Sequence, residues 1–131
     1  MLEVLPDKGT YLDIGSGTPI KGSNTLLLYL NGWSGTCIDG VKRRRAKLLR
    51  PRDTYKVEYV ESIFDYMDYD LLDLDVDGIE LEILKTMVFL PKWILVECHM
   101  KAQAGIPDYL ISKGYEIIGM TKMNKFFRRI E

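Results

Sequence analysis

Residues 10–39, TYLDIGSGTPIKGSNTLLLYLNGWSGTCID, decide the fold of this chain. They begin with an apolar run of strand length at 10–14, which is followed by a glycine-rich turn at 15–22. A helix at about 23–31 and a second apolar strand at 34–39 complete the stretch. Two strands joined by a helix form a βαβ unit, in which the strands run parallel in one sheet. The stretch therefore predicts an α/β protein.

The same alternation of strand-length runs and longer amphipathic stretches continues along the chain. Further strands are predicted at 56–60, 70–76 and 93–98, and helices at 41–49, 79–89 and 106–113, with a turn or two of helix at 62–67. Pro51 stops the first of these helices, and Gly114 follows the last one as a C-terminal cap would. The runs 115–120 and 125–130 flank a turn at 122–124 and predict an antiparallel hairpin. The expected architecture is a mostly parallel sheet with a C-terminal antiparallel pair.

Length and composition limit the class of protein. A chain of 131 residues with 47% hydrophobic and 28% charged residues predicts one globular domain spanning 1–131. No apolar run approaches the roughly 18 residues of a membrane span, and the first residues, MLEVLPDKG, lack the pattern of a signal peptide. Cys37 and Cys98 lie within apolar runs, which is typical of buried reduced thiols rather than of disulfides or zinc ligands. We therefore expect a cytoplasmic protein without a membrane partner.

Charge is segregated along the chain although its formal net value is only -1. Seven basic residues crowd the segment 42–52, and acidic residues dominate from Asp53 to Glu82. The basic segment can be interpreted as a patch for nucleic acid or another polyanion, because clustered cations release counterions on binding. The alternative is a solvated helix face, which we favour because the chain has no DPPY-like tetrapeptide and no Pro-Cys nucleophile motif.

The ends of the first two strands carry the elements of a nucleoside site. Gly15 and Gly17 can adopt positive φ angles and let a ligand approach the backbone closely. Asp39 ends the second strand, about 26 residues after Asp13, where an acidic side chain can accept the hydroxyls of a ribose. Pro19 and Ile20 interrupt the dinucleotide pattern GxGxxG. The two strand ends thus predict a nucleoside site that is not specific for NAD.

Carboxylates and the single histidine cluster in the second half of the chain. Asp73, Asp75 and Asp77 alternate in DLDVD and would share one face of an extended strand. Glu97 and His99 end the next strand and would meet Asp75 and Asp77 if the two strands are parallel neighbours. Histidine suits proton removal at neutral pH, so His99 is a candidate general base. It could also ligate a metal together with the carboxylates, or serve only as a structural hydrogen-bonding residue.

Three blocks of this sequence resemble the FkbM family of S-adenosylmethionine-dependent methyltransferases. Residues 11–39 resemble the opening of that family, with its DIG turn, SNT helix start and GWxGxxIE strand. LLDLDVDGIELEILKTM resembles the fourth strand and helix, and ISKGYEIIGMTKMNKFFRRI resembles the closing strand and hairpin. The blocks stand in the family's order, so the resemblance implies a Rossmann-like class I methyltransferase fold.

The resemblance also implies an activity and a set of site residues. It implies transfer of a methyl group from S-adenosyl-L-methionine to a hydroxyl of a sugar, a glycan or another small molecule. The cofactor-binding residues that it implies are Asp13, Gly15, Ser16, Gly17, Asp39 and Asp75. Asp39 would hold the ribose, Asp75 would lie beneath the sulfonium, and Ser23 and Asn24 would brace the loop. His99, or failing it Glu97 or Asp77, would be the catalytic base, and no metal ligand is assigned.

The chain departs from the family pattern at several positions. Gly40 follows Asp39 where Pro is common, and the segment between the third and fourth strands is short. Three interpretations therefore remain: a pared-down enzyme, an enzyme completed by a second subunit, and a noncatalytic S-adenosylmethionine-binding protein. The last would use its basic helix for interaction with nucleic acid or another polyanion.

Overall fold

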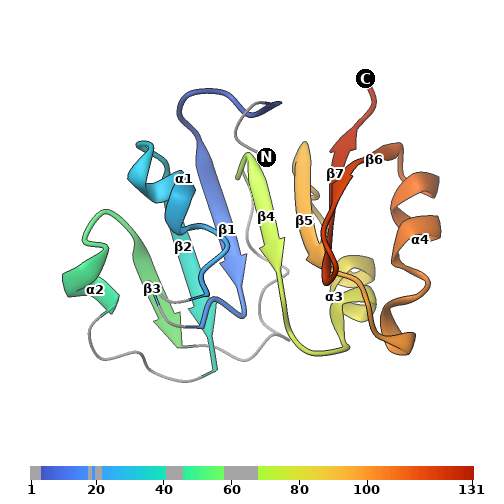
Figure 1. Cartoon of the computed structure of the whole chain (residues 1–131), viewed down its shortest axis with the longest axis horizontal. Coiled ribbons are helices and arrows are strands. Elements are labelled where there is room, and N and C mark those ends of the chain that lie inside the picture. Colours follow the sequence, from blue (N-terminus) through green and yellow to red (C-terminus); the bar gives the residue numbers. More distant parts are fainter. Residues whose placement is uncertain (1–3, 18, 20–21, 41–45, 58–67) are drawn as a thin grey trace.

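A computed structural model describes residues 4–17, 19, 22–40, 46–57 and 68–131. Its strands are β1 (Thr10–Ile14), β2 (Ser34–Asp39), β3 (Thr54–Val57), β4 (Leu71–Leu74), β5 (Trp93–Glu97), β6 (Tyr115–Met120) and β7 (Asn124–Arg129). Its α-helices are α1 (Leu26–Leu30), α2 (Ala46–Leu49), α3 (Glu80–Thr86) and α4 (Ile106–Ser112), and a short 3₁₀ helix covers Lys101–Gln103. Figure 1 shows the strands side by side in one twisted sheet.

The sheet has the strand order β3-β2-β1-β4-β5-β7-β6. The first five strands of this order pair in parallel, whereas β7 is antiparallel to both β5 and β6. This arrangement confirms the predicted α/β fold with its C-terminal antiparallel pair. The strand order reverses between β1 and β4, and in open α/β sheets ligands bind beyond the carboxyl ends of the strands at such a point.

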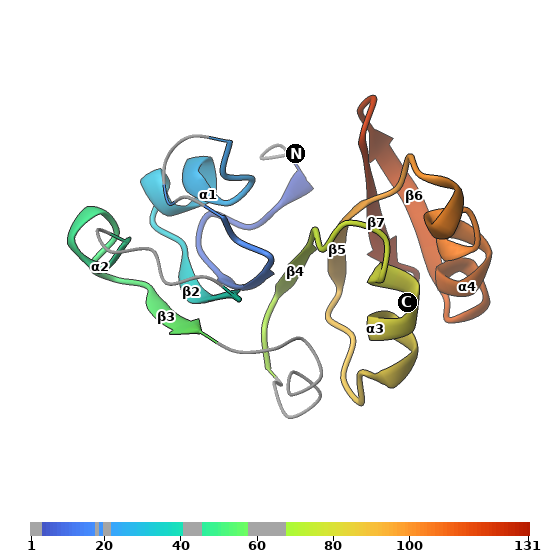
Figure 2. The same ribbon diagram turned by 90° about the horizontal axis from the view of Figure 1, so that it is seen from below.

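Helices cover both faces of the sheet. On one face, Leu12, Leu72 and Ile94 of the sheet pack with buried residues of α3 and α4. On the other, Tyr11, Leu71 and Trp93 pack with Leu28 of α1. Figure 2, which looks along the sheet from its carboxyl edge, shows α1 on one side and α3 on the other. Alternate strand residues therefore serve two separate apolar layers, as the period of a strand requires.

Several elements are shorter than the sequence predicts, because side-chain hydrogen bonds or an extended residue end them. The first helix begins at Leu26 rather than at residue 23, because the side chains of 23–25 bond to other segments. Strand β4 ends at Leu74 instead of 76, since the Glu80 carboxylate accepts hydrogen bonds from the backbone N–H groups of Val76 and Gly78. Helix α3 ends at Thr86 because Met87 is extended.

Strand β3 begins two residues before the predicted position, at Thr54. The rest of the predicted third strand, 58–60, and the predicted turn at 62–67 lie outside the described residues. The same holds for 41–45 of the predicted basic helix. Within the described part of the chain, no helix is long and apolar enough to cross a membrane.

A buried ion pair ties three segments of the chain together. The Arg50 guanidinium donates to the Asp53 carboxylate through Nε at 2.9 Å and Nη2 at 2.8 Å, and the two side chains are 1% and 0% exposed. Asp53 also accepts the Tyr11 hydroxyl of β1 and the Gly35 N–H of β2 at 3.0 Å. Arg50 also donates to the Tyr11 hydroxyl at 2.7 Å, to the Pro19 carbonyl at 3.0 Å and to two hydroxyl side chains that follow the glycine-rich turn. A buried charge pair of this kind is retained because each charge is fully hydrogen-bonded.

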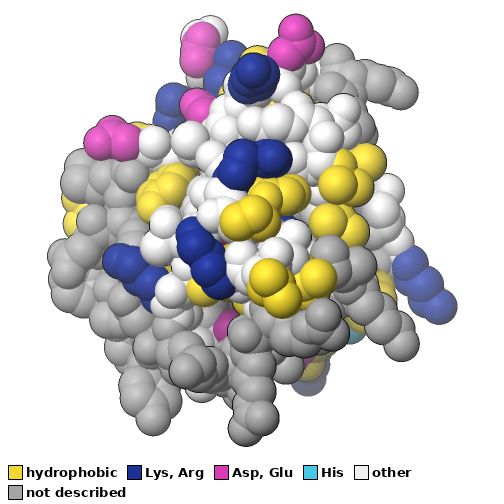
Figure 3. Space-filling view, turned by 90° about the vertical axis from the view of Figure 1, so that its left-hand side faces the viewer, with side chains coloured by type: hydrophobic (Ala, Val, Ile, Leu, Met, Phe, Trp, Pro, Cys, Tyr) yellow, Lys and Arg dark blue, Asp and Glu magenta, His cyan; other side chains and the backbone are white. Residues whose placement is uncertain are grey.

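The described part of the basic segment holds one buried arginine and two exposed cations that contact other parts of the protein. Arg50 is buried, Arg52 stacks on the Tyr29 ring at 3.9 Å, and the Lys47 ammonium donates to the Pro51 and Asp53 carbonyls. Figure 3, which views the molecule from the α2 side, shows basic side chains scattered among hydrophobic ones. Arg50 thus lies inside the protein, whereas Lys47 and Arg52 are exposed and also contact internal acceptors or a ring. Both interpretations of the segment stay predictions, because 41–45 lies outside the described residues.

We predict that Asp53→Ala lowers the free energy of unfolding by about 3–5 kcal/mol, because it leaves the buried Arg50 charge without its counterion. Urea unfolding followed by circular dichroism measures the loss. The exposed Asp7→Ala is the matched control and should change stability by less than about 0.5 kcal/mol. A similar small change for both variants would show that the ion pair does not hold these segments together.

Candidate active site

An open cleft lies beyond the carboxyl ends of β1, β2 and β4, where the strand order reverses. Its volume is about 420 Å³, and the described residues that line it are Gly15, Gly17, Asp39, Gly40, Asp75, Val76 and Asp77. This volume lies within the range of about 300–1,000 Å³ found for small-molecule sites. The cleft brings the predicted glycines and Asp39 together with Asp75 and Asp77, although more than 30 positions separate the two groups.

The glycine turn and Asp39 are joined directly. The Gly17 N–H donates a hydrogen bond of 2.7 Å to Asp39 Oδ2, and the N–H groups of Gly15 and Ser16 donate to the Ile38 carbonyl. Gly15 and Gly17 have φ angles of +76° and +62°, which favour glycine. A Cβ on Gly15 would lie 1.9 Å from the Asp75 carbonyl oxygen, so the turn packs directly on the end of β4. The turn can therefore carry a ligand close to the Asp39 carboxylate.

Asp13 does not line this cleft. It lies opposite Asp73 in the β1–β4 register, and the two residues are 1% and 3% exposed. Burial raises the pKa of both carboxyl groups, and their mutual interaction keeps the pKa of Asp73 high. Thr25 donates to Asp13 at 2.6 Å and Asn24 donates to Asp73 at 3.3 Å. The pair thus anchors the chain that leaves the glycine turn, and a direct contact of Asp13 or Ser16 with a cofactor stays a prediction.

The expectation that Asp73, Asp75 and Asp77 share one face is wrong. Strand β4 ends at Leu74, and Asp77 has a φ of +54°, so the chain turns before the third carboxylate. Asp73 remains in the sheet with Asp13, whereas Asp75 and Asp77 reach the cleft. The reason is the turn built around the Glu80 carboxylate, which the strand pattern does not reveal.

Asp75, Asp77 and Glu97 do form one acidic cluster at the carboxyl edge, as expected for neighbouring parallel strands. Their carboxylate oxygens lie within 4.8 Å of one another. Partial burial and the Glu97 charge raise the pKa of Asp75 to about 7. Burial opposes the charge of Glu97, but hydrogen bonds from Gln103 and His99 lower its pKa. The cluster therefore exchanges a proton near neutral pH, mainly at Asp75.

His99 lies beside this cluster. Its Nε2 is 3.3 Å from Glu97 Oε2, and about a third of its side chain is exposed. Glu97 is buried and could stabilise a positive charge on the imidazole. This geometry fits a base that removes a proton at the surface of the site and is then stabilised as an imidazolium by the Glu97 carboxylate.

Two buried residues that the sequence did not single out support the cluster. The Gln103 side-chain amide donates to Glu80 at 2.9 Å and Glu97 at 2.7 Å, and its oxygen accepts the N–H groups of His99 and Met100. The position of Glu80 in the first turn of a helix after Gly78 is a signal for a capping carboxylate. Gln103 carries no such signal, because its role depends on distances through space.

The fold is shared with proteins of known structure. At 12% identity, ribosomal protein L11 methylase from Lactobacillus delbrueckii subsp. bulgaricus matches 98% of this chain and 74% of its own length, with a TM-score of 0.73. The chain has the fold of class I S-adenosylmethionine-dependent methyltransferases. A second similar structure is that of 1,6-didemethyltoxoflavin-N1-methyltransferase from Burkholderia thailandensis, with bound 1,6-didemethyltoxoflavin and S-adenosylhomocysteine. The match covers 95% of this chain and 72% of the length of that protein, at 12% identity and with a TM-score of 0.66.

A third is N-methyltransferase NodS from Bradyrhizobium japonicum WM9 in complex with S-adenosylhomocysteine. The match covers 93% of this chain and 78% of the length of NodS, at 14% identity and with a TM-score of 0.63. A comparison with protein-family models gives no match. A comparison with curated proteins gives none either. These similarities therefore establish the methyltransferase fold.

We predict that Gly15→Ala destabilises the protein more than Gly17→Ala does. Each variant places a side chain at positive φ, which costs about 1–2 kcal/mol. Gly15→Ala must also displace the Asp75 backbone, which adds about 1–3 kcal/mol, whereas no atom of the described residues lies within 4 Å of a Cβ added at Gly17. Denaturant unfolding of the two variants measures the difference, and equal losses would show that the turn does not press on β4.

We predict that Asp75→Asn stabilises the protein at pH 8 and leaves its stability unchanged at pH 4. The folded-state pKa of about 7 exceeds the unfolded value of about 3.9, so the ionised carboxylate increasingly destabilises the fold as the pH rises towards 7. Solvent screening of this half-buried group reduces the expected gain to about 1–2 kcal/mol. Thermal unfolding across this pH range measures it, with exposed Asp108→Asn as control. A gain that does not depend on pH would contradict the assignment.

Proposed function

We propose that this protein is an S-adenosylmethionine-dependent methyltransferase that acts on a hydroxyl group of a small molecule. The observation that carries the proposal is the cleft in which the Gly15–Gly17 turn meets the Asp39 carboxylate at the switch point of the sheet. Two proteins that share the fold were crystallised with S-adenosylhomocysteine, and one also holds a small-molecule acceptor. The sequence blocks that resemble the FkbM family support a hydroxyl acceptor, on a sugar, a glycan or another small molecule.

The residues of the cleft fit the cofactor in shape and charge. Asp39 would accept the ribose hydroxyls while it holds the turn through the Gly17 N–H. Bound S-adenosylmethionine would supply a methyl group activated by a positive sulfur. The ionised form of Asp75, with Asp77 beside it, would compensate positive charge in the cleft.

The hydroxyl acceptor must lose a proton during the transfer, and the site offers a path for it. His99 would take the proton, because its Nε2 has a buried carboxylate 3.3 Å away that stabilises the imidazolium. Glu97 would stay ionised in this role, since hydrogen bonds from Gln103 and His99 lower its pKa. Asp77 lines the cleft on the other side of the cluster and is the alternative acceptor of the proton.

We also propose that the protein is cytosolic. Cys37 and Cys98 are buried and unpaired, which fits a reducing compartment.

Isothermal titration calorimetry with S-adenosylhomocysteine tests the proposal. We expect binding that Asp39→Asn weakens about tenfold, because the variant loses charged hydrogen bonds to the ribose hydroxyls. The asparagine oxygen can still accept the Gly17 N–H, so the turn keeps its anchor. Asp7→Asn is the control for removal of one negative charge and should bind as the wild type does. Absence of heat with millimolar ligand would disprove the proposed function.

A further inference from the structure

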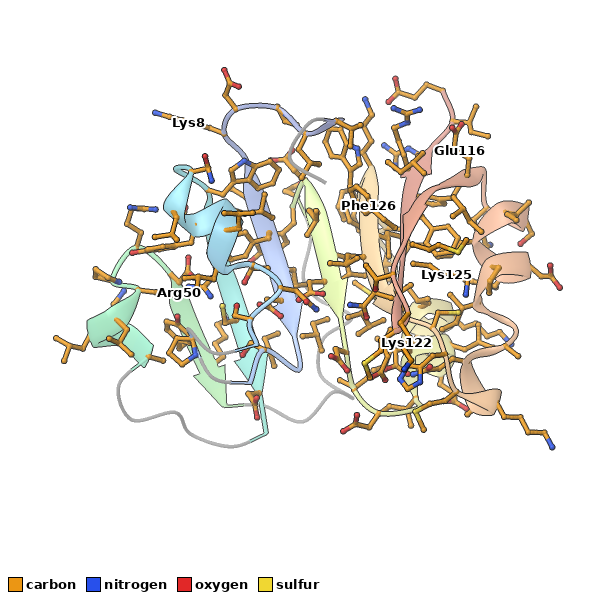
Figure 4. The ribbon with its side chains drawn as sticks, in the orientation of Figure 1. Lys8, Arg50, Glu116, Lys122, Lys125 and Phe126 are labelled. Carbon is orange, nitrogen blue, oxygen red and sulfur yellow. The ribbon has the colours of Figure 1, made fainter. Side chains whose placement is uncertain are left out.

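A second pocket lies on the α1 face of the sheet and shares no lining residue with the cofactor cleft. Its volume is about 350 Å³. The walls come from Leu95 of β5, Phe126 of β7, Asn24 after the glycine-rich turn, and residues 119–121 and Asn124 of the C-terminal hairpin. Phe126, labelled in Figure 4, is 6% exposed and forms part of the apolar layer under α1. One wall of the pocket therefore belongs to the packed apolar core.

The walls of the pocket continue into the acidic cluster. Asn124 pairs with Glu97 in the antiparallel β5–β7 register, and Leu95 stands two residues before Glu97 on the same strand. On the opposite wall, the Asn24 amide donates to Asp73, two residues before Asp75. Asp75 and Asp77 of the cluster line the cofactor cleft, so the walls of the pocket lead to carboxylates that border the cleft. A molecule in the pocket would thus have the proposed proton acceptors at one end.

We propose that this pocket binds the methyl acceptor, and that the acceptor is an uncharged, mainly apolar ring compound that carries a hydroxyl group. This inference rests on the proposed function and narrows its substrate class. The volume suits a molecule of one or two rings. The proposed acceptor class does not include a glycan in this pocket.

The chemistry of the walls favours this class of molecule. Leu95, Met120 and Phe126 offer apolar contact, and Phe126 offers an aromatic ring for edge or face contact. Among the described residues that line the pocket, the polar side chains are two amides and the Thr121 hydroxyl, and none is charged. A charged ligand would lose hydration there without a counterion, and a sugar would place many hydroxyls against apolar groups.

Gly119 leaves the space that the pocket needs. It lies in β6 at an irregularity of the β6–β7 pairing. A Cβ at this position would be 3.8 Å from the Phe126 Cβ, which is ordinary contact, and the backbone has no positive φ. An alanine therefore fits without strain, whereas a leucine would extend into the pocket. Alanine and leucine at Gly119 would therefore reduce the space in the pocket by different amounts, which can be compared in a binding test.

Backbone amide NMR shifts of residues 119–124 test the proposal, with 1-naphthol as the probe and the protein saturated with S-adenosylhomocysteine. We expect 1-naphthol to shift these amides and methyl β-D-glucoside at the same concentration to leave them unchanged. Gly119→Leu should raise the dissociation constant for 1-naphthol at least tenfold, and Gly119→Ala less than threefold. Each variant should bind S-adenosylhomocysteine as tightly as the wild type.

A second pair of variants keeps the test informative if Gly119→Leu does not fold. Met120 lines the pocket and is 66% exposed, whereas Met123 of the same hairpin is 50% exposed and is not a lining residue. Met120→Trp should weaken 1-naphthol binding by narrowing the pocket, and Met123→Trp should not. Equal effects of the two substitutions would overturn the assignment.

The outcomes separate this inference from the proposed function. Tight S-adenosylhomocysteine binding without naphthol shifts in the hairpin would overturn the acceptor pocket and leave the methyltransferase proposal standing. Hairpin shifts with methyl β-D-glucoside as large as those with 1-naphthol would overturn the assigned substrate class. Naphthol binding by a protein that does not bind S-adenosylhomocysteine would overturn the proposed function, and with it the role of the pocket as an acceptor site.

Discussion

The hydrogen bonds of one buried guanidinium hold the cofactor side of this molecule together. Arg50 is almost fully enclosed, so each of its N–H groups needs an acceptor inside the protein. Asp53, the Tyr11 hydroxyl and the Pro19 carbonyl supply acceptors from three different segments. Strand β1, the glycine-rich turn and the chain after α2 must therefore take their positions together. The hydrogen bonds of Arg50, including the one to the Pro19 carbonyl, stabilise the glycine-rich turn that contacts Asp39. Helix α1, which has only five residues, contributes less.

A second constraint acts at the carboxyl edge of the sheet, where like charges are close together. Asp75, Asp77 and Glu97 repel one another, and a proton near neutral pH relieves this repulsion at Asp75. Glu97 keeps its negative charge because Gln103 and His99 stabilise it. The same edge faces the cofactor cleft on one side and the apolar pocket on the other. The proposed catalytic residues and the proposed acceptor pocket thus meet at the polar carboxyl edge of the sheet.

Much of the fold could be predicted from local pattern. The strands 10–14, 34–39 and 115–120 have the bounds that the sequence predicts, because apolar runs between turn residues have few alternatives. Strand β4 ended early because a nearby side chain, that of Glu80, accepts hydrogen bonds from the backbone groups that follow the strand. The Asp73–Asp75–Asp77 face was predicted wrongly for this reason. The burial of Arg50 within the basic segment was not predicted, since composition cannot distinguish an exposed arginine from one with buried partners.

The sequence by itself determined the α/β class, the glycine turn and the acidic residue at the end of β2, because these follow from period, turn chemistry and short spacings. It also placed Asp75, Asp77, Glu97 and His99 near one edge, since parallel neighbours align their carboxyl ends. Only the tertiary structure decided that Asp13 pairs with Asp73, that Arg50 is buried, and that Gln103 stabilises the acidic cluster. Those contacts depend on strand register and on partners that are far apart in the chain, 60 residues for Asp13 and Asp73, which no local pattern records.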